Sequence, residues 1–186
     1  MTNETLSLIS ARRSHRAYAS TPLTQEQIDA LLKAAVESPS AVNRQPWHFT
    51  VVRNQQLLDE INQAVWEQMM KRYPEKRSPR FADKDFHVFY HAPCVIVISG
   101  MPDFHYTPID GGIAVENIAL AAESMGLGSV ILGMPRDAFL GDRADTFRKA
   151  LHFPEGWDFV IAIAVGIPTD TKPAHEVKED RISFVD

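Results

Sequence analysis

The chain has 186 residues, a formal net charge of −5 and an apolar fraction of 45%, which predicts one globular domain over residues 1–186. The negative charge argues against binding nucleic acid or an anionic membrane through net charge. The strongest apolar run, 94–98, is too short to span a bilayer, and no basic and apolar leader opens the chain, so we expect a cytoplasmic protein.

A short helical pattern at the start of the chain leads into a basic cluster. The cluster places three guanidinium groups, a hydroxyl and an imidazole within five residues: Arg12, Arg13, Ser14, His15 and Arg16. One guanidinium group can bind two phosphate oxygens at once. A phosphomonoester needs more than one cation if it is to be held away from bulk water. The cluster is therefore a candidate phosphate site, and a solvated basic turn is the alternative.

The next helix is predicted by its N-terminal cap. Thr24 and Gln27 fit a capping box, and apolar residues then recur at helical spacing. Pro39 ends the pattern, because proline cannot continue a helix and restricts the residue before it. The helix leads directly into a loop that ends at Pro46. Because both prolines fix their own φ, we expect this loop to be extended and stiff.

Neutral polar side chains gather in this loop. Ser40, Asn43 and Gln45 supply hydroxyl and amide groups, which suit the edge of a flat heteroaromatic ring such as a flavin. Trp47 follows directly and fits the start of a strand as a core aromatic. An ordinary surface turn is the alternative interpretation, because serine, asparagine and proline are common turn residues.

The rest of the chain alternates between strands and helices. We expect strands at 49–52, 93–99, 128–132 and 159–165 and helices at 57–69 and 109–125. Cys94 begins an apolar strand, so we expect a core residue and not a nucleophile. Residues 71–86 mix charges, prolines and aromatics without a period, and we expect them to form a mobile cover over a pocket.

The helix expected at 109–125 has almost no polar face, so it must be buried on most sides. In a small protein, a subunit interface can bury a helix on all sides, and small alanine and glycine residues allow close approach. This pattern supports a homodimer. A central helix in a monomer is the alternative.

Together, these segments resemble the nitroreductase family of flavin mononucleotide (FMN) enzymes. The resemblance rests on Arg-Arg-Ser-x-Arg, Pro-Ser-Ala-x-Asn-x-Gln-Pro-Trp, Asp110-Gly111-Gly112, Gly126-Leu127-Gly128 with Gly133, and a basic tail. It implies an α+β fold with three layers, α/β/α, in which helices cover both faces of a mixed, mostly antiparallel sheet. It also implies an intertwined homodimer with flavins at its interface, where residues 181–185 cross as a strand onto the partner's sheet.

The resemblance also implies which residues bind the cofactor. The arginine cluster would hold the FMN phosphate, the proline-bounded loop would reach the flavin of the partner subunit, and backbone at Gly133 would lie near the flavin N5. Leu132 departs from the acidic or aromatic residue that many relatives carry there. In the tail, His175 stands where arginine is common, and Lys178 or Arg181 is an alternative to it or to Lys172. The expected set is Arg12, Arg13, Ser14, Arg16, Pro39, Ser40, Ala41, Asn43, Gln45, Asp110, Leu132, Gly133, Lys172 and His175.

The implied activity is a ping-pong cycle in which NAD(P)H, the co-substrate, reduces FMN and a nitroaromatic, quinone or similar small acceptor reoxidises it. The cofactor carries this chemistry, so we predict no catalytic side chain. The sequence also lacks the spacings that are typical of metal sites. Two alternatives are a flavin-binding carrier or sensor without turnover, and a related FMN enzyme that removes halide reductively or consumes the flavin.

Overall fold

The computed structural model describes residues 3–72 and 86–185 of the chain. Its elements are α1 (Glu4–Ala11), α2 (Gln25–Val36), the 3-10 turn η1 (Ala41–Asn43), β1 (Trp47–Val52), α3 (Gln55–Arg72), β2 (Cys94–Gly100), α5 (Thr107–Ser124), β3 (Gly128–Leu132), η2 (Met134–Leu140), α6 (Ala144–Ala150), β4 (Asp158–Gly166) and η3 (Glu179–Arg181). The expected alternation of helices and strands is confirmed. Of the cover expected at 71–86, residues 71–72 belong to the last turn of α3, and 73–85 lie outside the described residues.

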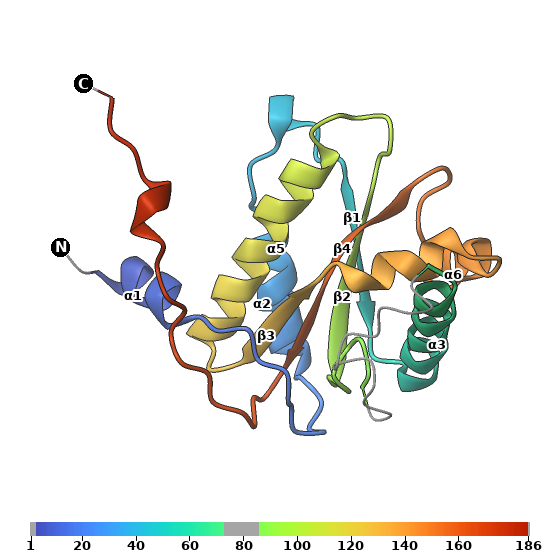
Figure 1. Cartoon of the computed structure of the whole chain (residues 1–186), viewed down its shortest axis with the longest axis horizontal. Helices are drawn as coiled ribbons and strands as arrows, with labels where there is room; N and C mark the ends of the chain where they lie inside the picture. The colour runs from blue at the N-terminus through green and yellow to red at the C-terminus, as the bar shows by residue number, and fades with distance from the viewer. Residues whose placement is uncertain (1–2, 73–85, 186) are drawn as a thin grey trace.

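The strands form one sheet in the order β1-β2-β4-β3, and every neighbouring pair is antiparallel. Within the described residues, the parallel component is an isolated bridge between Ser14 and Ser129. Figure 1 shows α2 and α5 on one face of the sheet and α3 and α6 on the other. The α+β fold with three layers is therefore confirmed. None of the described helices is long and apolar enough to cross a membrane.

Two apolar cores lie on the two faces of the sheet, because side chains alternate along each strand. On β2, Cys94, Ile96 and Ile98 point to the core with α2 and α5. Val95 and Val97, between them, point to the core with α3 and α6. Burial raises the pKa of the Cys94 thiol to about 11, against a smaller opposite effect of a nearby arginine charge. The cysteine is thus a core residue, as its neighbours in the sequence predict.

Helix α5 packs closely on the sheet because Gly111 has no side chain. A Cβ at this position would lie 2.7 Å from Cγ1 of Val160 in β4, closer than real Cβ contacts. The other side of the helix is open in the single chain, where Ile109 and Ile113 are 55% and 37% exposed. The single chain therefore buries α5 only on the sides that face the sheet and α2, so the expectation of an all-round buried helix is met in part.

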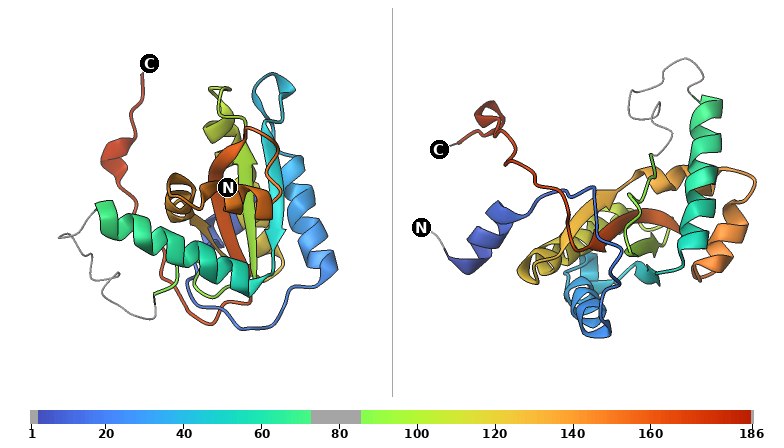
Figure 2. Two further views of the ribbon diagram at one scale, coloured as in Figure 1. Left: turned by 90° about the vertical axis from the view of Figure 1, so that its right-hand side faces the viewer. Right: turned by 90° about the horizontal axis from the view of Figure 1, so that it is seen from below.

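Helix α1 and the C-terminal segment project from the same side of the molecule (Figures 1 and 2). Helix α1 has no buried residue, and Phe184 and Val185 are 88% and 97% exposed. The edge strand expected at 181–185 is absent from the single chain, where η3 ends at Arg181 and no strand follows up to residue 185. A strand needs a neighbouring strand for its backbone hydrogen bonds. Its exchange onto a partner's sheet stays a prediction.

Candidate functional site

The basic cluster and the basic tail line one pocket of about 330 Å³. The lining residues are Arg12, Arg13, Ser14, Arg16, Lys172, Pro173, Ala174 and His175. Every tail residue in this set lies more than 150 positions from the cluster in sequence, and the fold brings the two segments together. Lys178 and Arg181 do not line the pocket, and Arg181 forms an ion pair with its neighbour Asp180 at 3.4 Å. Lys172 and His175 are therefore the tail residues that the fold brings to the cluster.

The end of α1 fixes where the first two arginines lie. The Arg13 guanidinium donates to the carbonyls of Ser10 and Arg12 at 2.7 and 2.8 Å, so it satisfies carbonyl groups that the helix end leaves unpaired. Arg12 Nε lies 3.3 Å from a carboxylate oxygen of Glu116 on α5. These contacts use some of the five N–H donors of each guanidinium, and the others remain for a ligand.

The segment after Arg13 is held in extended form between two partners. Ser14 bridges to Ser129, and the His15 amide donates to the Ser129 carbonyl at 2.9 Å. On the other side, the Thr169 amide donates to Ala17 O at 3.0 Å. The start of β3 and the chain after β4 therefore fix the backbone of the cluster.

The proline-bounded loop is not extended, so that expectation is wrong. Residues Ala41–Asn43 form a 3-10 turn, and Val42, Asn43 and Gln45 have φ of 50°, 52° and 49°. The prolines restrict only themselves and the residues before them, which leaves Ala41–Asn43 free to turn. Gln45 takes a positive φ although it precedes Pro46. A hydrogen bond from the Gln45 amide to Ser40 Oγ at 2.9 Å closes the turn.

Asp110 holds this loop from the first turn of α5. Its side chain is buried, with the residue 3% exposed, and both carboxylate oxygens lie 3.3 Å from the Ala41 amide nitrogen. The contact joins residues that are 69 positions apart in sequence. Two residues of the expected set thus meet within one chain. Asn43 and Gln45 are exposed and bond to each other, with Gln45 Nε2 3.1 Å from Asn43 Oδ1.

At the end of β3, the accessible groups are backbone atoms of Gly133 and not the side chain of Leu132. Leu132 is 4% exposed and packs in the core with α3, whereas Gly133 is exposed and a Cβ there would meet nothing within 4 Å. Gly133 lies four positions beyond Ser129, which corresponds to about 13 Å of extended chain. A ligand that reaches from the basic pocket to Gly133 must therefore be elongated.

The loop and the basic pocket lie apart in the single chain. In Figure 1, η1 lies beyond the N-terminal end of α5, while the segment that follows α1 crosses beside the other end of that helix. The expected cofactor residues therefore form two groups: the basic pocket, and the loop with Asp110.

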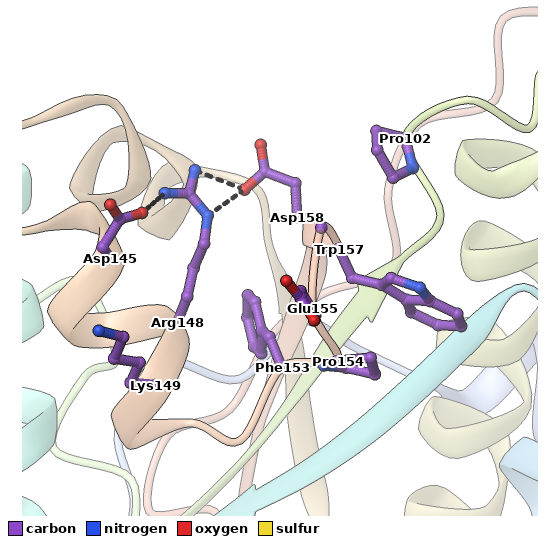
Figure 3. A pocket seen from close by; sticks show the side chains of 10 residues that line it. Pro102, Asp145, Arg148, Lys149, Phe153, Pro154, Glu155, Trp157 and Asp158 are labelled. Carbon is purple, nitrogen blue, oxygen red and sulfur yellow. Dashed lines mark hydrogen bonds and ion pairs between the residues drawn. The ribbon is translucent and has the colours of Figure 1, made fainter.

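A second pocket, of about 650 Å³, lies between α6 and the start of β4 (Figure 3). Arg148 crosses it, with its guanidinium 2.9 Å from Asp145 and 3.0 Å from Asp158, and it also donates to Phe139 O at 3.1 Å. The two carboxylates already neutralise this cation, and no member of the expected cofactor set lines the pocket. We therefore assign the candidate site to the smaller basic pocket, although this second pocket has the larger volume.

The comparison with protein families decides the relationship. The model of the nitroreductase family matches residues 9–167, which is most of the chain. The chain belongs to the nitroreductase family.

Individual nitroreductase relatives match along nearly the full chain. A crystal structure of a nitroreductase with bound FMN from Desulfitobacterium hafniense is 34% identical, covers 100% of both chains and superposes with a TM-score of 0.91. An Archaeoglobus fulgidus protein with the provisional name NADH dehydrogenase/NAD(P)H nitroreductase is 34% identical over 97% of this chain and 94% of its own. An iodotyrosine deiodinase of Thermotoga neapolitana is 27% identical over 92% of each.

One residue beside the basic pocket, Asp170, is not part of the nitroreductase pattern in the sequence. Asp170 lies two positions before Lys172, and its carboxylate contacts His15, the Arg16 amide and Lys172. A lone acidic residue in a polar tail carries no signal in the sequence. Its role depends on how the tail pairs with residues 15–19, which only the fold defines.

Proposed function

We propose that the protein is an FMN-dependent oxidoreductase that oxidises NAD(P)H and reduces a nitroaromatic, quinone or similar acceptor in a ping-pong cycle. The observation that carries this proposal is the basic pocket, in which Arg12, Arg16 and Lys172 come together in a member of the nitroreductase family. FMN, when bound, supplies the acceptance and onward transfer of hydride, and the protein supplies binding and orientation. The FMN-bound Desulfitobacterium hafniense structure and the NAD(P)H in the Archaeoglobus fulgidus name support the two cofactors.

The donor set of the basic pocket fits a phosphomonoester. Such a group carries between one and two negative charges near neutral pH and accepts hydrogen bonds at three oxygens. The pocket offers guanidinium groups, an ammonium group, the Ser14 hydroxyl and the His175 imidazole. Guanidinium forks match phosphate geometry. Cations from both the cluster and the tail would therefore hold the phosphate end of FMN.

We further propose a homodimer in which the loop of one subunit reaches the flavin of the other. In support, the loop and the basic pocket lie apart within one chain, although the family pattern assigns both to one cofactor. Apolar residues also remain exposed on α1 and α5, where Ile9 and Ile109 are 50% and 55% exposed, and exposed apolar patches mark interaction sites. Light scattering coupled to size-exclusion chromatography tests this proposal, and a monomer at micromolar concentration would contradict it.

The visible spectrum of the purified protein, followed by NADH or NADPH without oxygen, tests the proposed activity. A yellow protein that bleaches and regains its colour with a nitroaromatic or quinone supports the oxidoreductase. A yellow protein that stays yellow favours a carrier or sensor. A colourless protein that cannot be reconstituted with FMN overturns the proposal.

Reductive dehalogenation is the second candidate, because the Thermotoga neapolitana relative is an iodotyrosine deiodinase. In this reaction, two electrons and a proton replace a carbon–halogen bond by a carbon–hydrogen bond and release halide. The two candidates differ in what the reduced protein releases. Halide release from iodotyrosine that is faster than nitroaromatic reduction would favour dehalogenation, and the opposite order would favour the first candidate.

A further inference from the structure

Asp170 joins the two halves of the basic pocket. Its Oδ1 lies 2.7 Å from Nδ1 of His15, and its Oδ2 accepts from the Arg16 amide at 3.0 Å and lies 3.4 Å from Nζ of Lys172. The first two partners belong to the N-terminal cluster, and the third belongs to the tail. One carboxylate therefore contacts both segments that line the pocket.

His15 points away from the pocket because the segment is extended. Side chains alternate along extended backbone, so Ser14 and Arg16 face the pocket while the imidazole between them faces Asp170. Gly128 leaves room for the imidazole, since a Cβ there would lie 3.0 Å from both Cβ and Cδ2 of His15. With the His15 amide on Ser129, the histidine is fixed by its backbone and by its ring.

Asp170 is charged near neutral pH. Partial burial raises the pKa of its carboxyl, but hydrogen bonds from the Arg16 amide, His15 and Lys172, together with the charge of His15, outweigh this and hold the pKa below its ordinary value of 3.8. A carboxylate beside an anion site opposes the anion by simple Coulomb repulsion. Charge alone therefore does not explain a carboxylate at this position.

We propose that Asp170 is a positioning residue that, through His15 and the Arg16 amide, orients the cluster and the Lys172 ammonium for one phosphate group. This inference rests on the proposed function, because it requires that the pocket bind the FMN phosphate. It adds that the carboxylate strengthens phosphate binding although it carries the same sign of charge. Orientation and Coulomb repulsion thus predict opposite effects when the charge is removed.

Asp170→Asn tests the sign of the effect. The measurement is the affinity of the apoprotein for FMN and for riboflavin, which lacks the phosphate. Orientation predicts that the variant loses at least about tenfold in FMN affinity while riboflavin affinity stays the same. Unchanged or tighter FMN binding would overturn the proposal. The matched control is Asp137→Asn, whose side chain is 16% exposed, compared with 18% for Asp170, and pairs with Arg72 at 3.2 Å outside the pocket.

If Asp170→Asn does not fold, two variants of His15 test the same proposal. His15→Asn keeps an N–H donor near the position of Nδ1, and His15→Leu removes it. We expect the first variant to keep most of the FMN preference over riboflavin and the second to lose it, whereas equal preference in both would contradict the role of the carboxylate. A wild-type protein without any preference for FMN over riboflavin would instead refute the phosphate site itself. Failure of the inference and failure of the proposed function are therefore distinguishable.

Discussion

The buried carboxylate of Asp110 accepts a hydrogen bond from the Ala41 amide, with both oxygens 3.3 Å from the nitrogen. Asp110 lies in the first turn of α5, where the positive end of the helix dipole favours a carboxylate. Helix α5 thus anchors the start of the loop at Ala41, although the sequence predicts an extended segment there.

Asp110→Ala should lower the free energy of unfolding by about 1–3 kcal/mol, because it leaves the Ala41 amide without its partner. Asp110→Asn should cost less, since an amide oxygen still accepts a hydrogen bond. Urea unfolding of both variants measures the difference. As a control, Asp29→Ala removes an exposed carboxylate that bonds only Gln25 in α2 among the described contacts, and we expect a change within about 0.5 kcal/mol. Equal losses in the two Asp110 variants would argue against the hydrogen bond.

Val42 is the second test of the loop, because a β-branched residue has φ of 50° there and is 90% exposed. The left-handed region costs an ordinary residue about 1–2 kcal/mol, and glycine avoids this cost but loses about 0.5–1 kcal/mol in chain entropy. Val42→Gly should therefore raise the free energy of unfolding by about 0.5–1 kcal/mol. Val177→Gly, at an exposed position outside the left-handed region, should bring no gain. A loss at Val42 would show that its side chain makes contacts in the assembled protein.

The basic pocket gives the third prediction. Arg12→Ala combined with Arg16→Ala should weaken FMN binding by at least about 1.5 kcal/mol, since hydrogen bonds to charged groups are worth about that much or more. Titration of the apoprotein with FMN measures the loss. The matched control is Arg181→Ala, because Arg181 lies in the same tail but pairs with Asp180 and does not line the pocket. Unchanged FMN affinity in the double variant would refute the phosphate site.

The sequence predicts the local parts of this protein well. The capping box is present, with the Gln27 amide 3.2 Å from Thr24 Oγ1 and the Thr24 amide 2.9 Å from Gln27 Oε1. Continuous apolar runs predict the central strands, because both faces of the sheet are buried against a core. These features depend on residues close together in the sequence, so a pattern can reveal them.

The parts that the sequence does not predict depend on distant contacts. Asp110 holds the start of the loop at Ala41, 69 positions away, and Asp170 meets His15 across 155 positions. No local pattern encodes either pairing. The family resemblance predicts that the cluster and the tail come together, and residues of both segments line the basic pocket. The strand expected at 181–185 stays a prediction, because it depends on a partner chain.

A histidine pair beside α3 makes the stability of the fold depend on pH. The rings of His87 and His91 lie 4.4 Å apart, and His87 Nε2 lies 3.1 Å from a carboxylate oxygen of Asp59. The Phe89 amide donates to His87 Nδ1 at 3.2 Å, which requires a neutral imidazole with its proton on Nε2. Burial first, and then the neighbouring His91, lower the pKa of His87 below its ordinary 6.5, while Asp59 opposes the shift.

Because this pKa is lowered on folding, the unfolded chain binds more protons than the folded chain between the lowered pKa and 6.5, and the free energy of unfolding rises with pH in that interval. The stability is fully present above 6.5 and is lost as the pH falls below it. His87→Gln should therefore flatten the pH dependence of urea unfolding between pH 7.5 and 5.5, and His91→Ala should flatten it in part. Asp59→Asn should steepen it, because Asp59 raises the pKa. His105→Gln, at an exposed position, should follow the wild type, and a His87→Gln profile that also follows the wild type would exclude the pair as the source of acid sensitivity.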